Sequence, residues 1–368
     1  MEQESILVAT LILIAGFISI EIGISTAILE IMAGVISANF LGLHSIYWID
    51  YLADFGLLGL MFFAGFETDP KLLKKNLYKN LTLGITSYIV PFVIVFTIAI
   101  AIFNLGTEAA ILLGISLSTT SLALVYAVLR ERKMSSTVTG QIILGGAMIA
   151  DVLSMLSLTL LVGDYGIYTV IYTILLFAFL YLSPKIGRFI FQRYKGHTAE
   201  IEIKFILLLL LTMPFFSERV GISEAVFAFL LGILFSEMIE EDELVEEKLK
   251  GLVFGFLAPA FFFKAGLLMN LTHLTNINVL YLVTLFGTVA FLGKYLGVYI
   301  VSKKIIEEKT VSAVGLFFNF RLTFGIVAAL FGLENGYITA EMYAAVLTII
   351  LLTSAISSIA LKAIPHEL

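Results

Sequence analysis

The sequence alternates between long apolar runs and short polar or charged segments. About 20 consecutive apolar residues cross the hydrocarbon core of a bilayer as a helix. The runs are continuous instead of alternating residue by residue, which favours helices over the strands of a membrane barrel. The pattern predicts an all-α membrane protein with about thirteen transmembrane helices, near residues 5–21, 24–41, 48–66, 77–103, 107–130, 136–163, 166–194, 199–217, 222–238, 245–269, 275–302, 309–332 and 338–362.

Positive charge is distributed unevenly over the loops between these runs. Lysine and arginine gather in every second loop, at 71–79, 130–133, 185–195, 248–250 and 303–309. The intervening loops carry only Arg219. Since cytoplasmic loops are enriched in basic residues, this alternation places the N-terminus outside and the C-terminus in the cytoplasm. It also favours an odd number of spans.

An internal repeat relates two parts of the chain. Residues 19–36 align without gaps to 217–234, and Gly34 matches Gly232. The following segments also correspond, "MFFAGF" at 61–66 with "FFFKAGL" at 261–267. The copies are seven helices apart, an odd offset, so they run in opposite directions through the membrane. Inverted-topology repeats are typical of secondary transporters, although chance similarity between two apolar segments is the alternative.

The composition excludes several classes of function. Hydrophobic residues make up 60% of the chain and charged residues 14%, which is far below a soluble domain. The net charge of −6 argues against nucleic acid as a partner. There is no cysteine, so disulfides and zinc–thiolate sites are excluded. The N-terminus lacks the basic region and cleavage site of a signal peptide, so we expect a retained first helix.

Asp151 is the leading candidate for chemistry. It lies midway along the predicted helix 136–163 and has no charged neighbour for more than ten residues on either side. A charge at membrane depth costs at least ~2.5–3.5 kcal/mol and marks a functional site by default. A carboxylate there can hold a proton or a metal cation, but not both, and this competition couples two opposed ion flows. The alternative is a protonated aspartate bonded to the helix backbone.

Two helices carry polar interruptions at corresponding positions. Thr119, Thr120 and Ser121 break the apolar run 107–130. Asn319 and Arg321 break the run 309–332. Hydroxyl groups can satisfy a backbone that unwinds, and the freed carbonyls can bind Na⁺ or K⁺. Ordinary bonding of Ser and Thr back to a helix carbonyl is the alternative.

Three further charged residues fall within predicted helices. Lys294 is a natural counter-charge for Asp151, or else a lysine that reaches to the inner membrane surface. Lys264 is surrounded by phenylalanines, and Glu30 lies in the second helix. The acidic stretch 236–248 is interpreted as a solvated cytoplasmic loop, with a cation or pH sensor as the alternative. The roles of Lys264 and of this stretch stay open.

The ordered set of these motifs resembles the monovalent cation:proton antiporter-2 family, the Kef-type and NapA-type exchangers. The resemblance covers essentially the whole chain. It is carried by "ISTAILEIMAGVI" with Glu30, "FAGFETD" at 63–69, the Thr-Ser segment of 119–121, "GGAMIADVLSML" with Asp151, and "LGKYLGVY" with Lys294. The chain departs from the pattern at three places: Ala150 replaces the first member of the acidic pair, "FRLT" at 320–323 stands where Arg-Gly-Glu is frequent, and Lys264 is charged at a usually uncharged position.

The resemblance implies a NapA-like fold and a homodimer in the lipid bilayer. Helices in 5–66 and 199–269 would form the dimerisation part, and those in 77–163 and 275–362 the ion-translocating core. Residues 166–194 would link the two parts. The two interrupted helices would cross beside Asp151, which would bind the ion, while Lys294 would be the site lysine. Kef proteins also carry a cytoplasmic nucleotide-binding domain, which we do not expect in this chain.

These observations predict a secondary transporter of a prokaryotic cell membrane, not an enzyme, with no cofactor. Our interpretation is exchange of Na⁺ or K⁺ for protons by alternating access, with competition at Asp151. A Kef-like K⁺ efflux channel and an organic-anion symporter are the alternatives. A channel needs a continuous polar lining, whereas only one polar cluster appears. The sequence does not choose among Na⁺, Li⁺ and K⁺, and it leaves the stoichiometry open, although a single titrating group favours 1:1 exchange.

Overall fold

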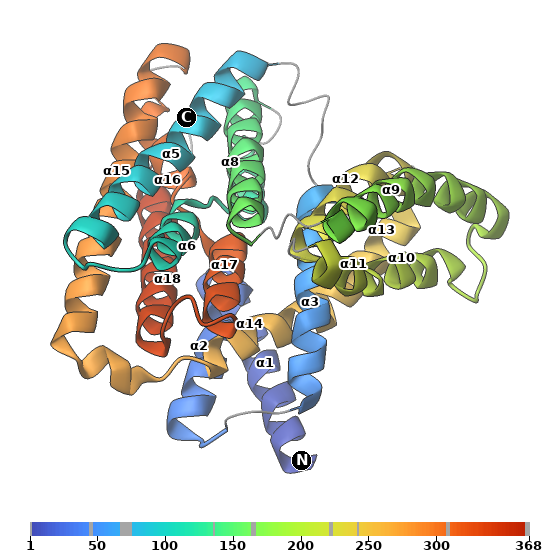
Figure 1. The fold of residues 1–368 in the computed structure, drawn as a ribbon, viewed down its shortest axis with the longest axis horizontal. Helices are drawn as coiled ribbons and strands as arrows, with labels where there is room; N and C mark the ends of the chain where they lie inside the picture. The colour runs from blue at the N-terminus through green and yellow to red at the C-terminus, as the bar shows by residue number, and fades with distance from the viewer. Residues whose placement is uncertain are drawn as a thin grey trace. The chain divides into compact units, whose positions relative to one another are not determined.

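The computed structural model describes residues 2–43, 47–66, 76–134, 137–162, 167–220, 224–240, 243–306 and 310–364. Every regular element in these ranges is a helix (Figure 1). The end of the "FAGFETD" motif, from residue 67, and residues 241–242 of the acidic stretch lie outside them. Two compact units divide the chain: unit 1 comprises 1–45, 70–158 and 262–368, and unit 2 comprises 46–69 and 159–261.

Unit 1 contains most of the helices, and α8 and α14 have residues in both units. Its elements are α1 (Glu2–Ile22), α2 (Thr26–Phe40), α5 (Leu77–Ala101), α6 (Thr107–Ser118), α7 (Leu122–Glu131), α8 (Val138–Val162), α14 (Ala258–Leu267), the 3₁₀ turn η2 (Leu271–Thr275), α15 (Ile277–Ile305), α16 (Val311–Phe317), α17 (Leu322–Glu334) and α18 (Ala340–Ala363). Those of unit 2 are α3 (Tyr47–Phe66), α9 (Ile167–Tyr194), α10 (Ile201–Leu211), α11 (Met213–Val220), α12 (Glu224–Glu240), α13 (Glu243–Leu252) and the π-helix η1 (Val253–Leu257).

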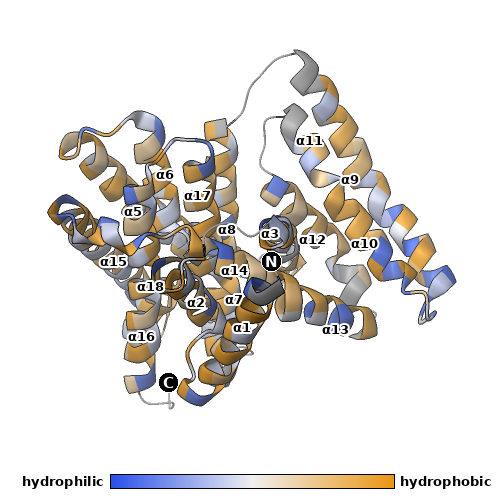
Figure 2. Cartoon of the chain, turned by 90° about the horizontal axis from the view of Figure 1, so that it is seen from below, coloured by the Kyte–Doolittle hydropathy of each residue, from blue (hydrophilic) through white to orange (hydrophobic). Residues whose placement is uncertain are grey.

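The length and apolarity of these helices fit a membrane. In the described residues, nine helical stretches are long and apolar enough to cross a bilayer, and shorter apolar helices occur at α2, α6 and in α12. In Figure 2, orange, the colour of hydrophobic residues, covers long parts of the helices. Large apolar side chains such as Phe17, Ile20 and Ile300 are exposed, as expected for residues that face lipid. The regular structure of the described ranges is thus entirely helical, and the protein crosses the membrane several times, while the number of thirteen spans stays a prediction.

Two predicted helices differ from the structure in a way that proline explains. The helix expected at 199–217 is divided into α10 and α11 at Thr212. Pro214 has no N–H to donate and disfavours the helical conformation of the preceding residue, so the helix restarts there. In the predicted helix 245–269, the π-helix η1 precedes Pro259. The carbonyl of Gly255 has no i+4 donor at Pro259, and the wider turn accommodates this.

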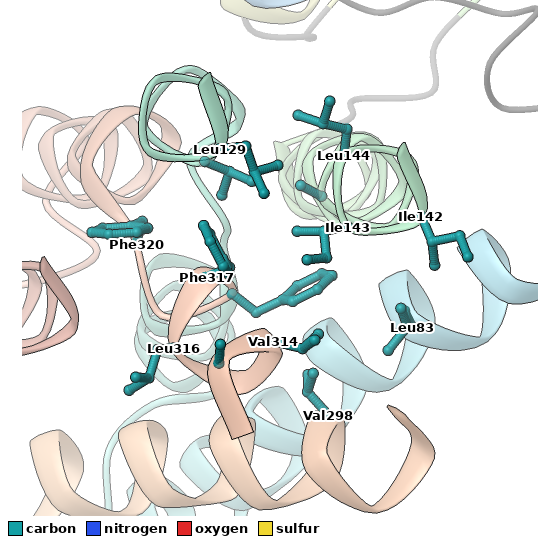
Figure 3. Packing of buried hydrophobic residues seen from close by; sticks show 14 of the residues in the cluster. Leu83, Leu129, Ile142, Ile143, Leu144, Val298, Val314, Leu316, Phe317 and Phe320 are labelled. Carbon is teal, nitrogen blue, oxygen red and sulfur yellow. The ribbon is translucent and has the colours of Figure 1, made fainter. Parts of the chain in front are cut away.

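A buried apolar cluster in unit 1 fixes the helices around the functional region. It joins side chains of α5, α7, α8, α15 and α16. Figure 3 shows Leu83, Leu129, Ile143, Val298 and Phe317 converging in this cluster. Interiors of this kind are close-packed, so the cluster fixes α8 and α15 relative to the breaks between α6 and α7 and between α16 and α17.

Glycine allows α2 and α14 to touch backbone to backbone in unit 1. A Cβ atom on Gly34 would lie 2.1 Å from the carbonyl oxygen of Phe263. One on Gly266 would lie 2.1 Å from the carbonyl oxygen of Ile31. Any larger residue at either glycine would force these helices apart. Small residues are the usual means of close helix packing in membranes.

A second crossing of the same kind joins α3 and α12 in unit 2. A Cβ atom on Gly65 would lie 1.9 Å from the carbonyl oxygen of Phe229. One on Gly232 would lie 1.9 Å from the carbonyl oxygen of Phe62. Each unit therefore contains one crossing at which two glycines meet two opposing carbonyl groups.

Candidate functional site

The first interruption lies between α6 and α7. Helix α6 ends at Ser118, and Thr119 is extended, with φ −63° and ψ 160°. Thr119, Thr120 and Ser121 are non-helical and at most 1% exposed. The break occurs at the hydroxyl residues that interrupt the apolar run in the sequence. It leaves the last carbonyl groups of α6 without partners inside the helix.

The second interruption lies between α16 and α17 and meets the first. Residues 318–321 separate these helices, and the backbone N–H of Ser121 donates to the carbonyl of Phe320 at 2.6 Å. The Thr120 hydroxyl donates to the carbonyl of Phe318 at 3.3 Å. The hydroxyls of Ser121 and Thr323 are 3.2 Å apart. Each break thus satisfies polar groups of the other, which is how unwound backbone persists at membrane depth.

Lys294 caps the end of α6. It is fully buried on α15, and its Nζ donates to the carbonyl of Ser118 at 2.7 Å and also to the carbonyl of Thr119. These are C-terminal carbonyls, where the helix dipole carries partial negative charge. The lysine side chain is buried against these carbonyls and does not extend to an exposed surface of the protein. Two carbonyl oxygens, those of Ser118 and Thr119, thus converge on its amino group.

Arg321 occupies the second break and is also fully buried. Its Nη2 donates to Asn319 Oδ1 at 2.6 Å and to the carbonyl of Ala290 at 2.7 Å. The Asn319 side-chain amide donates in turn to the carbonyl of Gly315 at 2.9 Å. Ala290 precedes Lys294 by one turn of α15, so the arginine links the second break to the helix that carries the lysine.

Asp151 lies on α8 and is 3% exposed. Asp151 and Arg321 both lie within electrostatic range of Lys294, and their charges act on it with opposite signs. The structure therefore brings together a carboxylate, two cationic side chains and the first break. The neighbouring Ala150 is fully buried, and its carbonyl accepts a hydrogen bond from the Ser154 hydroxyl at 2.7 Å.

Glu30 and Lys264 have other surroundings. Glu30 is 5% exposed on α2, and none of the hydrogen bonds of the site includes it. Lys264 is buried on α14, and its Nζ lies 3.5 Å from Glu334 Oε1 at the C-terminal end of α17. An acidic residue is disfavoured at a helix C-terminus, so the lysine offsets this placement.

Sequence reasoning did not identify two components of the site. The hydroxyl of Ser354 on α18 accepts a hydrogen bond from the backbone N–H of Arg321 at 3.3 Å. Thr353, Ser354 and Ser357 lie close together in a mostly apolar helix and are all buried, and this polar cluster is the signal that could have found Ser354. The other component is the carbonyl of Ala290, which no side-chain pattern reveals.

Comparisons with known proteins show the family and the fold of the chain. Residues 6–365 match the family described as the transmembrane sodium/hydrogen exchanger. The "Probable Na(+)/H(+) antiporter 3" of Methanocaldococcus jannaschii is 28% identical, over 84% of this chain and 82% of that protein. A Na⁺/H⁺ antiporter of Enterococcus hirae is 28% identical, over 97% of this chain and 95% of that protein.

A solved structure shares the fold. The sodium proton antiporter MjNhaP1 from Methanocaldococcus jannaschii, determined at pH 8, superposes with a TM-score of 0.68. The match covers 97% of this chain and 95% of that chain at 17% identity. The family match extends over nearly the whole sequence and does not distinguish the Kef-type subgroup. The chain belongs to the sodium/hydrogen exchanger family of multi-pass membrane transporters.

Proposed function

We propose that the protein exchanges a monovalent cation for protons across the membrane, with both ions competing for Asp151. One observation carries this proposal: a buried carboxylate lies within electrostatic range of Lys294, whose amino group bonds to the terminal carbonyls of a broken helix. The names of the relatives support Na⁺/H⁺ exchange as the reaction. The exchange needs no cofactor, because the ions themselves are the substrates.

The ammonium of Lys294 marks the place of the transported cation. Carbonyl oxygens of Ser118 and Thr119 hold this ammonium, and the same oxygens are suitable ligands for Na⁺ or K⁺. The Thr120 hydroxyl donates to Phe318, and its oxygen can still accept or coordinate. A cation that binds between Asp151 and these groups would displace the ammonium from the carbonyls.

The expected stoichiometry is one proton for one cation. Ala150 stands where an acidic pair would place a second carboxylate, so Asp151 is the one carboxylate of the proposed site. If Lys294 stays charged throughout the cycle, a proton on Asp151 simply replaces the cation, and no net charge moves. The alternative cycle, in which Lys294 also releases a proton, moves two protons per cation.

The two glycine crossings support inverted repeats and thereby alternating access. Gly34 and Gly232 are equivalent in the sequence repeat, and so are Gly65 and Gly266. The carbonyls they approach, those of Phe263 and Phe62 and those of Ile31 and Phe229, are related by the same two alignments. Two copies of one arrangement with opposite orientation are the usual basis for a site that opens alternately to each side.

The same proposal also covers the division of the chain into parts, the oligomeric state and the orientation in the membrane. The dimerisation part would comprise 5–66 and 199–269, and the translocating core 77–163 and 275–362, joined by 166–194. The protein would act as a homodimer in the cell membrane of a prokaryote. The basic loops would place its N-terminus outside and its C-terminus in the cytoplasm.

Purified protein in liposomes that contain a pH-sensitive dye tests the function. Addition of Na⁺, Li⁺ or K⁺ in turn should change the internal pH with at least one of them. A channel would conduct K⁺ without a matching proton flux. An organic-anion symporter would leave the internal pH unaffected by cations alone. Either of these results would contradict the proposed exchange and favour the corresponding alternative.

A further inference from the structure

A hollow of about 330 Å³ separates parts of α15 and α18 in unit 1. Its floor includes Ile349 and Thr353, which are 1% and 3% exposed, and its rim includes Leu292, Leu352 and Ile356, each about half-exposed. Gly287 lines it without a side chain, and a Cβ added there would only reach ordinary contact with Ile349 at 3.6 Å. The hollow is therefore a groove that opens between two neighbouring helices at a glycine.

The lining of the groove is suited to hydrocarbon. The hydroxyl of Thr284 donates to the carbonyl of Leu280, and that of Thr353 donates to the carbonyl of Ile349 at 2.8 Å. These two hydroxyls are satisfied within their own helices, so they present methyl groups to a ligand. The other walls are Val, Ile, Leu, Phe and Gly, with the exposed Thr288 at one side.

The position of the groove along its two helices indicates which kind of molecule would fill it. Both walls belong to helices that are long and apolar enough to span a bilayer, and the groove lies in their middle parts. The surrounding medium at that depth is lipid acyl chains. We propose that this groove is a binding site for one acyl chain of a bilayer phospholipid. The energy comes from dispersion contacts, because lipid and groove are equally apolar, so binding is preferential and not tight.

The groove adjoins the candidate ion site through both of its walls. On α15, Gly287 and Phe291 line the groove, while Ala290 and Lys294 contact the two breaks on a neighbouring face of the same helix. On α18, Thr353 lines the groove, and the next residue, Ser354, bonds to Arg321. A bound acyl chain would pack against α15, which carries Lys294 and contacts the buried side chain of Arg321, and against α18, which contacts the Arg321 backbone. This inference rests on the helices alone and holds whichever ion is transported.

Photo-cross-linking tests the proposal. The protein is reconstituted with a phosphatidylcholine that carries a diazirine midway along one acyl chain, and labelled residues are mapped by mass spectrometry. Residues 283–292 and 349–356 should be labelled several-fold more than Leu296 and Ile300, which are exposed on α15 beyond the groove. This labelling should saturate as the probe fraction rises, whereas labelling at Ile300 should rise linearly.

Matched variants separate the groove from general lipid contact. Gly287→Leu places a side chain in the groove and should reduce its labelling to the level at Ile300. Gly287→Ala leaves most of the space and should retain the excess, as should Leu296→Phe outside the groove. If the leucine variant does not fold, the saturation comparison on the wild type decides alone. Uniform, unsaturable labelling of α15 and α18 would overturn the proposal.

A second copy of the chain is the competing occupant. The sequence has no cysteine, so Thr288→Cys introduces a single thiol beside the groove. Disulfide-linked dimers of this variant in membranes, together with unlabelled groove residues, would show that a protomer covers the groove and would overturn the lipid assignment. Monomers by this criterion, with labelling retained, support it.

Discussion

The ammonium of Lys294 bonds to the carbonyl oxygens of Ser118 and Thr119, at the end of a helix that stops in the middle of unit 1. A lysine that caps a broken helix neutralises the partial negative charge of the helix end. In the proposed exchange, it also occupies carbonyl ligands of the transported cation. The state of this lysine would then determine whether the cation can bind.

Replacement of Lys294 distinguishes the two stoichiometries. In the electroneutral cycle, Lys294→Gln should retain exchange, shift its pH optimum and produce no current, because the lysine does not titrate. Current on a solid-supported membrane after a Na⁺ jump measures this directly. A clear transient current in the wild type that disappears in Lys294→Gln would instead favour two protons per cation.

Competition at one carboxylate predicts a specific pH dependence. A proton on Asp151 excludes the cation, so acidification should raise the apparent KM for the cation, by up to about tenfold per pH unit in the competing range. At alkaline pH the rate should fall as protons become scarce, which gives a bell-shaped profile. Initial rates at several cation concentrations and pH values provide the test. A KM that does not change across the active range contradicts simple competition.

Thr120 should affect cation affinity more than proton binding. Its hydroxyl lies in the first break, and Thr120→Val should weaken cation binding by ~1–3 kcal/mol, the usual penalty for a buried polar partner left unsatisfied. Thr120→Ser keeps the oxygen and serves as the control. Isothermal titration at fixed pH, with thermal melts to verify folding, measures the effect. Equal affinity in valine and serine variants places the cation elsewhere.

Lys264 and Glu334 should be energetically coupled. Their charged groups are 3.5 Å apart, but the glutamate side chain is 51% exposed, so solvent screening limits the coupling to about 0.5–1 kcal/mol. Thermal melts of Lys264→Met, Glu334→Gln and the double variant form a mutant cycle. The double variant should lose less stability than the sum of the single variants. Strict additivity would mean that the contact contributes nothing.

Much of the fold could be predicted from the order of apolar and polar residues in this single sequence. Continuous apolar runs indicated membrane helices, and hydroxyl and amide residues marked both breaks because unwound backbone needs local polar partners. Pro214 and Pro259 each altered a helix that hydrophobic periodicity alone describes as continuous. The proline effect depends on hydrogen bonds four residues away, which a count of apolar residues does not include.

The site could be predicted only as a set of residue types. Asp151, Lys294 and Arg321 were identified because each is a charged residue within an apolar run. A charge at membrane depth is costly, so such residues are functional by default. The sequence did not show that Lys294 bonds to backbone carbonyls, since these have the same chemistry in every residue. Ser354 was missed because serine and threonine in a helix usually bond to the backbone of their own helix. Lys264 fulfils the same criterion of isolation, yet its amino group lies beside Glu334 at the end of α17.

The central claim is that Asp151 alternately carries the proton and the cation. Proton flux driven by a Na⁺ gradient, measured with an internal pH dye in liposomes, compares wild type, Asp151→Asn and Asp151→Glu. The account predicts that Asp151→Asn folds, as shown by an unchanged elution profile and melting behaviour, but exchanges nothing, because an amide neither titrates nor neutralises a cation. Asp151→Glu should retain partial exchange with an altered pH dependence. Wild-type flux in Asp151→Asn would contradict the account.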